Sequence, residues 1–270
     1  MLQQTDATTL TPIYSSLEPD VLPADTLARA FREQTGLYVL PVRLTGMYYD
    51  GRGDELIFCF RCTMRGGDLA IPEGQPPAGF FDAQPLPRGL AAPYRQPAGD
   101  TLHHKGGPVY LSSIEEGVGA RLGRLLSGRT RTAPSAPEWE VTVAVVASVV
   151  AALGDAVAWV RDRPGEPWRL PAGRVARGEA PWETIRRRLL PALGWYGGSE
   201  TLNGVYLAAG RPALTLVFAV TLRDVPPPNE NLHLAAPGDE MEVYDPQAQI
   251  QAINAREFLP RTLFHLAAGE

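Results

Sequence analysis

The feature that most constrains this 270-residue chain is an internal repeat with an offset of 158 residues. Between positions 29 and 65, many residues recur 158 positions further along without any gap. The identical residues in the first copy are Arg29, Gly36, Tyr38, Leu44, Gly46, Tyr48, Leu56, Phe60, Thr63 and Arg65. Because glycines and aromatic residues keep their register, we expect both copies to form the same supersecondary unit. The alternative is chance similarity in a chain rich in alanine, arginine and glycine.

The first copy has the pattern of one helix followed by two strands. We expect a helix over 24–35 that ends at Gly36, because glycine readily adopts the left-handed conformation found after many helices. Strands are expected over 41–49 and 55–64, joined by a turn at 50–54.

The second copy has the same pattern, with more chain before it. Its helix is expected over 181–193, where Pro181 suits the first position and Pro191 distorts the last turn. Gly194 is expected to end this helix. The strands of the second copy are expected over 140–151, 156–161, 203–208 and 213–222, and a further helix over 250–258.

The repeat also predicts where the domains divide. The positions 158 residues before the strand at 140–151 would lie before residue 1, so the first copy lacks this strand. Residues 113–126 have a helical pattern, and the Ser-, Thr-, Pro- and Gly-rich residues after them are typical of a linker. We therefore expect three segments: a truncated domain over 1–112, a helix and linker over 113–137, and a complete domain over 138–270.

The segment from Trp168 to Trp195 resembles the Nudix box. In that family, the box reads glycine, five residues, glutamate, seven residues, arginine, glutamate, an apolar residue, any residue, two glutamates, any residue, glycine and an apolar residue. The matching residues here are Gly173, Glu179, Arg187, Leu189, Gly194 and Trp195. In the first copy, residues 29–37 resemble the end of the same box. The resemblance implies two Nudix-like α/β/α sandwiches with mixed sheets, the first of them incomplete.

The carboxylates that hold metal in the Nudix family are missing from the second copy. In the family, these glutamates bind a divalent metal that helps to activate water for attack on a diphosphate. The corresponding residues here are Arg188, Pro191 and Ala192, none of which binds Mg²⁺. In the first copy, Glu33 is the one box carboxylate retained at a metal-ligand position. We therefore expect no metal site and no cofactor, and Mg²⁺ would be required only by a hydrolase.

The same loop and helix carry a cluster of arginines. Arg174, Arg186 and Arg188 could form an anion-binding pocket for a phosphorylated ligand without metal. We predict instead, as the resemblance implies, that Arg187 forms a salt bridge with Glu179 and that the other arginines lie on a solvated surface. The box residues with structural roles are then Gly173, Glu179, Arg187 and Gly194.

Composition narrows the classes of partner. The formal net charge is −5 and the pI is near 5.5, which argues against a nucleic-acid-binding surface. The most apolar stretch, residues 141–160, is interrupted by Gly154 and Asp155, so it is shorter than the ~20 residues of a membrane span. The first residues lack the pattern of a signal peptide. We therefore expect a cytoplasmic protein that contacts neither nucleic acid nor membrane.

Three classes of function remain. We expect a non-hydrolysing ligand-binding or regulatory module for a nucleotide-like or other phosphorylated small molecule. One alternative is a Nudix-type pyrophosphohydrolase of nucleoside diphosphate derivatives that holds metal through carboxylates outside the box. The other alternative is a scaffold or assembly protein.

The missing strands also predict an assembly. The apolar residues of the first copy that would have too little cover are Val42, Leu44, Leu56, Phe58 and Phe60. We expect the sheet of the first domain to be completed by the second domain, by residues 108–111, or by a second chain in a homodimer. The alternative is a smaller sheet capped by the helix expected over 113–126.

Overall fold

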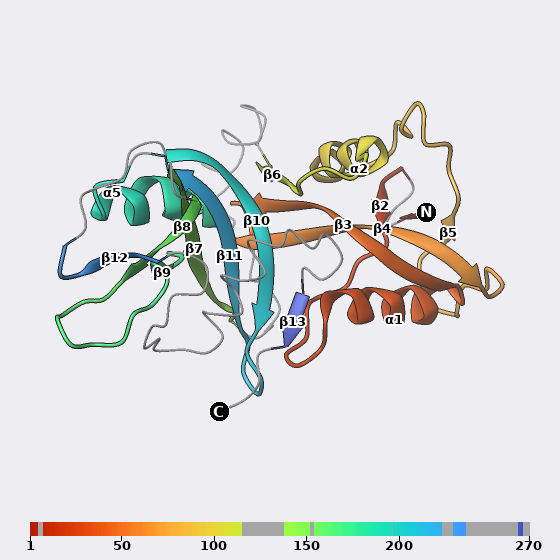
Figure 1. Ribbon diagram of the computed structural model, residues 1–270. Helices are drawn as coiled ribbons and strands as arrows, with labels where there is room; N and C mark the ends of the chain where they lie inside the picture. The colour runs from red at the N-terminus through yellow and green to blue at the C-terminus, as the bar shows by residue number, and fades with distance from the viewer. Residues whose placement is uncertain are drawn as a thin grey trace, which may run out of the picture. The chain divides into compact units, whose positions relative to one another are not determined.

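The computed structural model describes residues 1–4, 8–114, 138–151, 154–195, 197–222, 229–235 and 264–266. The chain divides into two compact units, Met1–Ala136 and Pro137–Glu270. Both combine mixed sheets with few helices, so the expected mixed α/β class is confirmed (Figure 1). The helix expected over 250–258 lies outside the described residues, as do residues 115–137. In the described part of the chain, no helix is long and apolar enough to cross a membrane.

The first unit contains two sheets. A small antiparallel sheet has the order β2-β1-β5, formed by β1 (Leu2–Gln4), β2 (Leu10–Pro12) and β5 (Ala78–Gly79). The larger sheet has the order β4-β3-β6, formed by β3 (Tyr38–Asp50), β4 (Glu55–Gly66) and β6 (Tyr110–Ser113). Two helices flank the β3–β4 hairpin (Figure 1), namely α1 (Pro23–Thr35) and α2 (Ala92–His103).

Helix α1 ends where the sequence predicts and begins one residue earlier, at Pro23. Pro23 lies in the first turn, where a missing backbone N–H is tolerated. Gly36 follows the last turn with φ 74°, and its N–H donates to the carbonyl of Arg32 at 2.9 Å. A Cβ at Gly36 would also lie 2.7 Å from the carbonyl oxygen of Asp68. Glycine is therefore required here by conformation and by space.

The prediction that five apolar residues of the first sheet are poorly buried is confirmed for only some of them. Val42 is 48% exposed, and Leu56, Phe58 and Phe60 are half-buried. Leu44 is 4% exposed, so the prediction for this residue is wrong. Leu44 lies just before residues 46–49, where β6 pairs in parallel with β3 and makes β3 the central strand of this sheet. The segment at 108–111 thus contributes to the strand that extends this sheet.

The second unit is built on one larger mixed sheet. The strand order of this sheet is β12-β8-β7-β11-β10-β13. The short strand β9 also pairs with β7, over residues 142–144. The strands are β7 (Glu140–Ala151), β8 (Gly154–Val160), β9 (Ala172–Arg174), β10 (Gly197–Leu207), β11 (Ala213–Leu222), β12 (Leu232–Ala235) and β13 (Phe264–Leu266). The helical segment between β9 and β10 consists of α4 (Pro181–Thr184), the π-helical turn η1 (Ile185–Leu189) and α5 (Leu190–Ala192).

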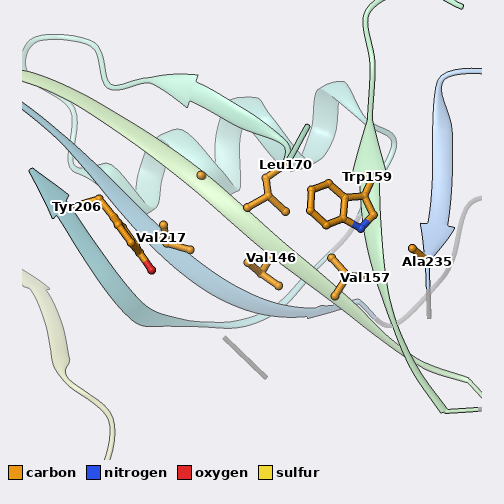
Figure 2. Close-up of a cluster of buried hydrophobic side chains, with 8 residues drawn as sticks. Val146, Val157, Trp159, Leu170, Tyr206, Val217 and Ala235 are labelled. Atoms are coloured by element: carbon orange, nitrogen blue, oxygen red, sulfur yellow. The ribbon is translucent and has the colours of Figure 1, made fainter. Parts of the chain in front are cut away.

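The strands of the second unit are apolar at nearly every position because their side chains form its core. Residues 143–147 of β7 are all buried, and because successive side chains of a strand point to opposite faces, this part of β7 is covered on both faces. Figure 2 shows Trp159, Leu170 and Tyr206 among the buried side chains of this cluster. Trp159, Trp182, Trp195 and Tyr206 are each at most 5% exposed, so these aromatic residues pack in the core.

The two β-hairpins share a local irregularity at positions 158 residues apart. The β3–β4 register shifts between Leu44 and Gly46, and the β10–β11 register shifts between Leu202 and Gly204. A Cβ at either glycine would collide with the ring of the tyrosine two residues further on, Tyr48 or Tyr206. Both hairpins also add a parallel third strand, β6 on β3 and β13 on β10.

Candidate functional site

A short strand and a helix start position the box loop. Gly173 lies in β9, where it pairs with Val143 of β7. The loop turns at Gly178, which has φ 80°, and the helix begins at Pro181. Gly194 follows the helix with φ 70°, as expected for a glycine that ends it. The loop and helix therefore lie against the strand that runs through the centre of the sheet.

The box helix departs from regular α-helical geometry at η1. The N–H of Leu190 donates to the carbonyl of Ile185, five residues earlier. Pro191 explains this widening, because a proline lacks an N–H and its ring collides with the preceding turn of a regular helix. We expected distortion in the last turn, around Pro191 itself. The structure places it one turn earlier, where the collision would occur.

Arg188 joins the box helix to the box loop. Its guanidinium lies 2.7 Å from the carboxylate of Glu179 and donates to the carbonyl of Arg174 at 2.9 Å. The hydroxyl of Thr184 donates to the same Glu179 carboxylate at 2.9 Å. The side chain of Glu179 is only 20% exposed, so its negative charge is neutralised largely by this arginine. A cation of the protein thus occupies a position where the Nudix box carries a metal-binding glutamate.

The predicted salt bridge between Glu179 and Arg187 is wrong. Arg187 instead pairs with Glu183 at 2.5 Å, one turn earlier on the same helix. The π-helical turn adds a residue to the helix at this point, which changes the phase of the side chains after Ile185. As a result, Arg188 rather than Arg187 faces the loop.

The other two arginines expected to bind an anion also face carboxylates. Arg186 makes a bidentate contact with Glu200, with nitrogen–oxygen distances of 2.8 and 2.7 Å. These hydrogen bonds raise the pKa of Arg186, and the Glu200 side chain is only 3% exposed. Arg174 lies 3.7 Å from Glu140, and both side chains are exposed. The helix face is therefore a set of ion pairs within the chain.

The remaining metal-ligand positions of the box are occupied by Pro191 and Ala192, which are exposed on α5. In the first unit, Glu33 lies on the exposed side of α1. Among the residues that the structure describes, no group of three or more His, Cys, Asp or Glu side chains is arranged to hold a metal ion.

A cavity of about 360 Å³ lies at the C-terminal end of the box helix. It is lined by residues of α5 and η1, by the end of β8, by the segment before β9 and by the residues around the start of β12. The lining residues are Val160, Arg161, Asp162, Arg169, Pro171, Ala172, Leu189, Ala192, Leu193, Trp195, Asn229, Asn231 and Leu232. Sequence reasoning missed this site, because the lining combines segments that are far apart in the chain.

Charged and aromatic groups lie beside the cavity. The Arg161 guanidinium stacks on the ring of Trp168 at 4.3 Å, and its Nε donates to the carbonyl of Glu230 at 2.6 Å. The ring of Trp168 also lies near that of His233, with ring centroids 5.5 Å apart. Arg169 pairs with Asp162 at 2.5 Å. Trp168 therefore contacts partners from two other segments and lies next to two lining residues, Arg161 and Arg169, without lining the cavity itself.

The mixed sheet, the glycine-led loop and the helix that follows it are the features that the resemblance to the Nudix box implies for the second unit. No family model matches the chain, and no curated protein matches its sequence.

Three solved structures to which the chain is similar are titled as NUDIX or MutT proteins, and each of these comparisons covers about half of this chain. A NUDIX hydrolase from Nitrosomonas europaea matches with a TM-score of 0.36 and 16% identity, over 48% of this chain and 79% of that one. A MutT protein from Bacillus halodurans matches with a TM-score of 0.36 and 15% identity, over 47% and 88%. The NUDIX domain of Shewanella oneidensis NrtR, in complex with ADP ribose, matches with a TM-score of 0.33 and 17% identity, over 51% and 97%.

Proposed function

We propose that the second unit is a Nudix-like domain that binds a nucleotide-like small molecule without hydrolysing it. The observation that carries this proposal is the pair of contacts made by Arg188, to Glu179 and to the carbonyl of Arg174. Together they place a guanidinium where the resemblance implies a carboxylate and a metal ion.

The charges of the box oppose metal binding. Mg²⁺ prefers oxygen ligands and is usually held by one or two carboxylates together with phosphate oxygens. Here, Mg²⁺ would have to displace a hydrogen-bonded arginine from Glu179, and the neighbouring positions Pro191 and Ala192 supply no carboxylate. Without a metal to neutralise the diphosphate and activate water, hydrolysis by the mechanism of the family has no support in this unit.

Binding is supported by the cavity at the end of the box helix. Its volume of about 360 Å³ lies within the range of small-molecule sites. The wall combines apolar side chains with Arg161 and Arg169, and arginine is well suited to contacts with phosphate. The resemblance to the Nudix box favours nucleotide-like molecules among the ligands that such a wall could bind.

Thermal unfolding tests this proposal directly. The full chain is heated with ADP-ribose, nucleotide sugars or dinucleotides, with Mg²⁺ or with EDTA. A ligand present at about 100 times its dissociation constant stabilises the folded state by about 2.7 kcal/mol. We expect at least one of these ligands to raise the melting temperature equally in Mg²⁺ and in EDTA. Stabilisation that requires Mg²⁺ would contradict the proposal, as would the absence of stabilisation by every ligand.

A further inference from the structure

Two arginines face each other across the β-hairpin of the first unit. Arg43 of β3 and Arg61 of β4 are cross-strand partners, so their side chains lie on the same face of the sheet. Like charges that are directly opposed on neighbouring strands destabilise a sheet. In the second unit, the positions 158 residues further on carry Thr201 and Ala219, which are paired in the same register. The hairpin therefore does not require two positive charges at this place.

Both guanidinium groups lie at the C-terminal end of α2. The Nη2 atom of Arg61 donates to the carbonyls of Thr101 and Leu102 at 2.9 and 3.1 Å. The Nη1 atom of Arg43 lies against Gly106 in the loop after α2, since a Cβ on this glycine would be only 2.5 Å from that nitrogen. The two side chains thus come together at the end of this helix and at the loop that follows it.

A third cation lies beside the two arginines, and the group has no carboxylate partner among the described residues. Lys105 is the only lysine of the chain, is exposed and directly precedes Gly106. Within the part of the chain that the structure describes, neither this lysine nor the two arginines form an ion pair. The neighbouring acidic residue of α2 is Asp100, whose carboxylate accepts a hydrogen bond from the hydroxyl of Tyr48 at 2.7 Å.

The charges of these residues favour a phosphate group as the ligand. A guanidinium donates paired hydrogen bonds to the oxygens of a carboxylate or a phosphate. A carboxylate carries a single negative charge, so it would offset the charge of one arginine alone. A phosphate monoester carries about two negative charges at pH 7 and has three acceptor oxygens, so it can contact both guanidinium groups and offset both charges.

We propose that Arg43 and Arg61 bind the phosphate group of a small molecule, with Lys105 at the edge of the site. The bound phosphate removes the repulsion between the two opposed arginines. The Nη2 atom of Arg61 continues to hold the end of α2, and its other nitrogens donate to the phosphate together with those of Arg43. The site belongs to the first unit, so it is independent of the ligand proposed for the second unit.

The single lysine allows a measurement that reports on this place alone. The full chain grown with ¹⁵N-lysine gives one lysine amide signal in a ¹H–¹⁵N NMR spectrum, that of Lys105. Inorganic phosphate and adenosine monophosphate are the probes, and acetate at the same ionic strength is the control anion. We expect both phosphates to move the Lys105 signal until it saturates, and acetate to leave it in place. Tighter binding of adenosine monophosphate would show that the organic part of the ligand also contributes.

Two matched variants separate this site from general attraction between charges. Arg43→Thr introduces the residue that the second unit carries at this position, and Arg43 makes no hydrogen bond or ion pair within the described residues that would be lost. We expect this variant to weaken phosphate binding about tenfold. Arg88→Thr removes the same charge from an exposed arginine that precedes the start of α2, so we expect it to leave binding unchanged. The melting temperature of each variant without ligand shows whether it is folded.

Three results would overturn the proposal. The first is a Lys105 signal that stays in place with either phosphate at about 10 mM. The second is an equal response to acetate, which would mean that the anions act only by screening charge. The third is an equal loss of binding in Arg43→Thr and Arg88→Thr, because the net charge of the chain would then matter and the position of the arginine would not.

Discussion

Arg188 lies on the box helix at a position where the resemblance to the Nudix box implies a metal-binding glutamate. A glutamate at this position would place a second carboxylate beside Glu179, and such a pair attracts a divalent cation. The arginine places a positive charge there instead, 2.7 Å from Glu179. The same side chain reaches the carbonyl of Arg174, so it also holds the loop against the helix. One residue therefore changes both the charge of the box and the way in which its loop is supported.

At this scale we predict a difference between two neighbouring arginines. Arg188→Met leaves the half-buried Glu179 carboxylate with the hydroxyl of Thr184, so we expect the free energy of unfolding to fall by about 1 kcal/mol. Arg187→Met removes an exposed pair with Glu183, and we expect a loss of about 0.5 kcal/mol or less. Denaturant titration of both variants measures these changes. Equal losses would show that Arg188 does not brace the loop.

The β3–β4 and β10–β11 hairpins share a sequence pattern, a glycine followed two residues later by a tyrosine, and the same irregularity at that glycine. In each one, a glycine at the register shift leaves room for the ring of a tyrosine two residues further on. Tyr48 and Tyr206 are both buried. A repeated glycine and tyrosine at this spacing thus has a steric reason, because the ring covers a backbone position that has no side chain.

Substitution of Gly204 tests this element. In Gly204→Ala the new Cβ would lie 2.7 Å from the Tyr206 ring, so the buried ring must move. We expect the free energy of unfolding to fall by about 1–3 kcal/mol. Gly173→Ala is the control, because its Cβ would meet Leu189 at an ordinary 3.9 Å.

The cost at Gly204 should also depend on the ring. In a Tyr206→Leu background, we expect Gly204→Ala to cost less than it does alone, because the atoms that it meets are gone. Denaturant titration of the two single variants and the double variant completes the cycle. Additive losses would contradict a steric origin.

Over the whole molecule, the sequence predicted more of the fold than of the candidate site. Glycines at 36 and 194, the valine runs and the apolar strands are local signals, and they predict the helix ends and the main strands. The partner of Glu179 was not predictable from spacing, since a π-helical turn changes which arginine faces the loop. The cavity was not predictable either, because its lining combines segments that are far apart in the chain. A pattern within one helix or strand can be recognised in the sequence. A site formed by segments that are far apart in the chain can be recognised only in the folded structure.

A measurement of hydrolysis tests the central claim, which is that the second unit does not catalyse metal-dependent hydrolysis. The full chain is incubated with ADP-ribose or a nucleotide sugar in the presence of Mg²⁺ or Mn²⁺, and the release of mononucleotide is measured by chromatography. The structure predicts no release above that of the buffer, because Arg188 neutralises Glu179 and the positions of Pro191 and Ala192 offer no carboxylate. Release that stops with EDTA, and that is lost in Glu179→Gln or in Glu33→Gln, would contradict this account.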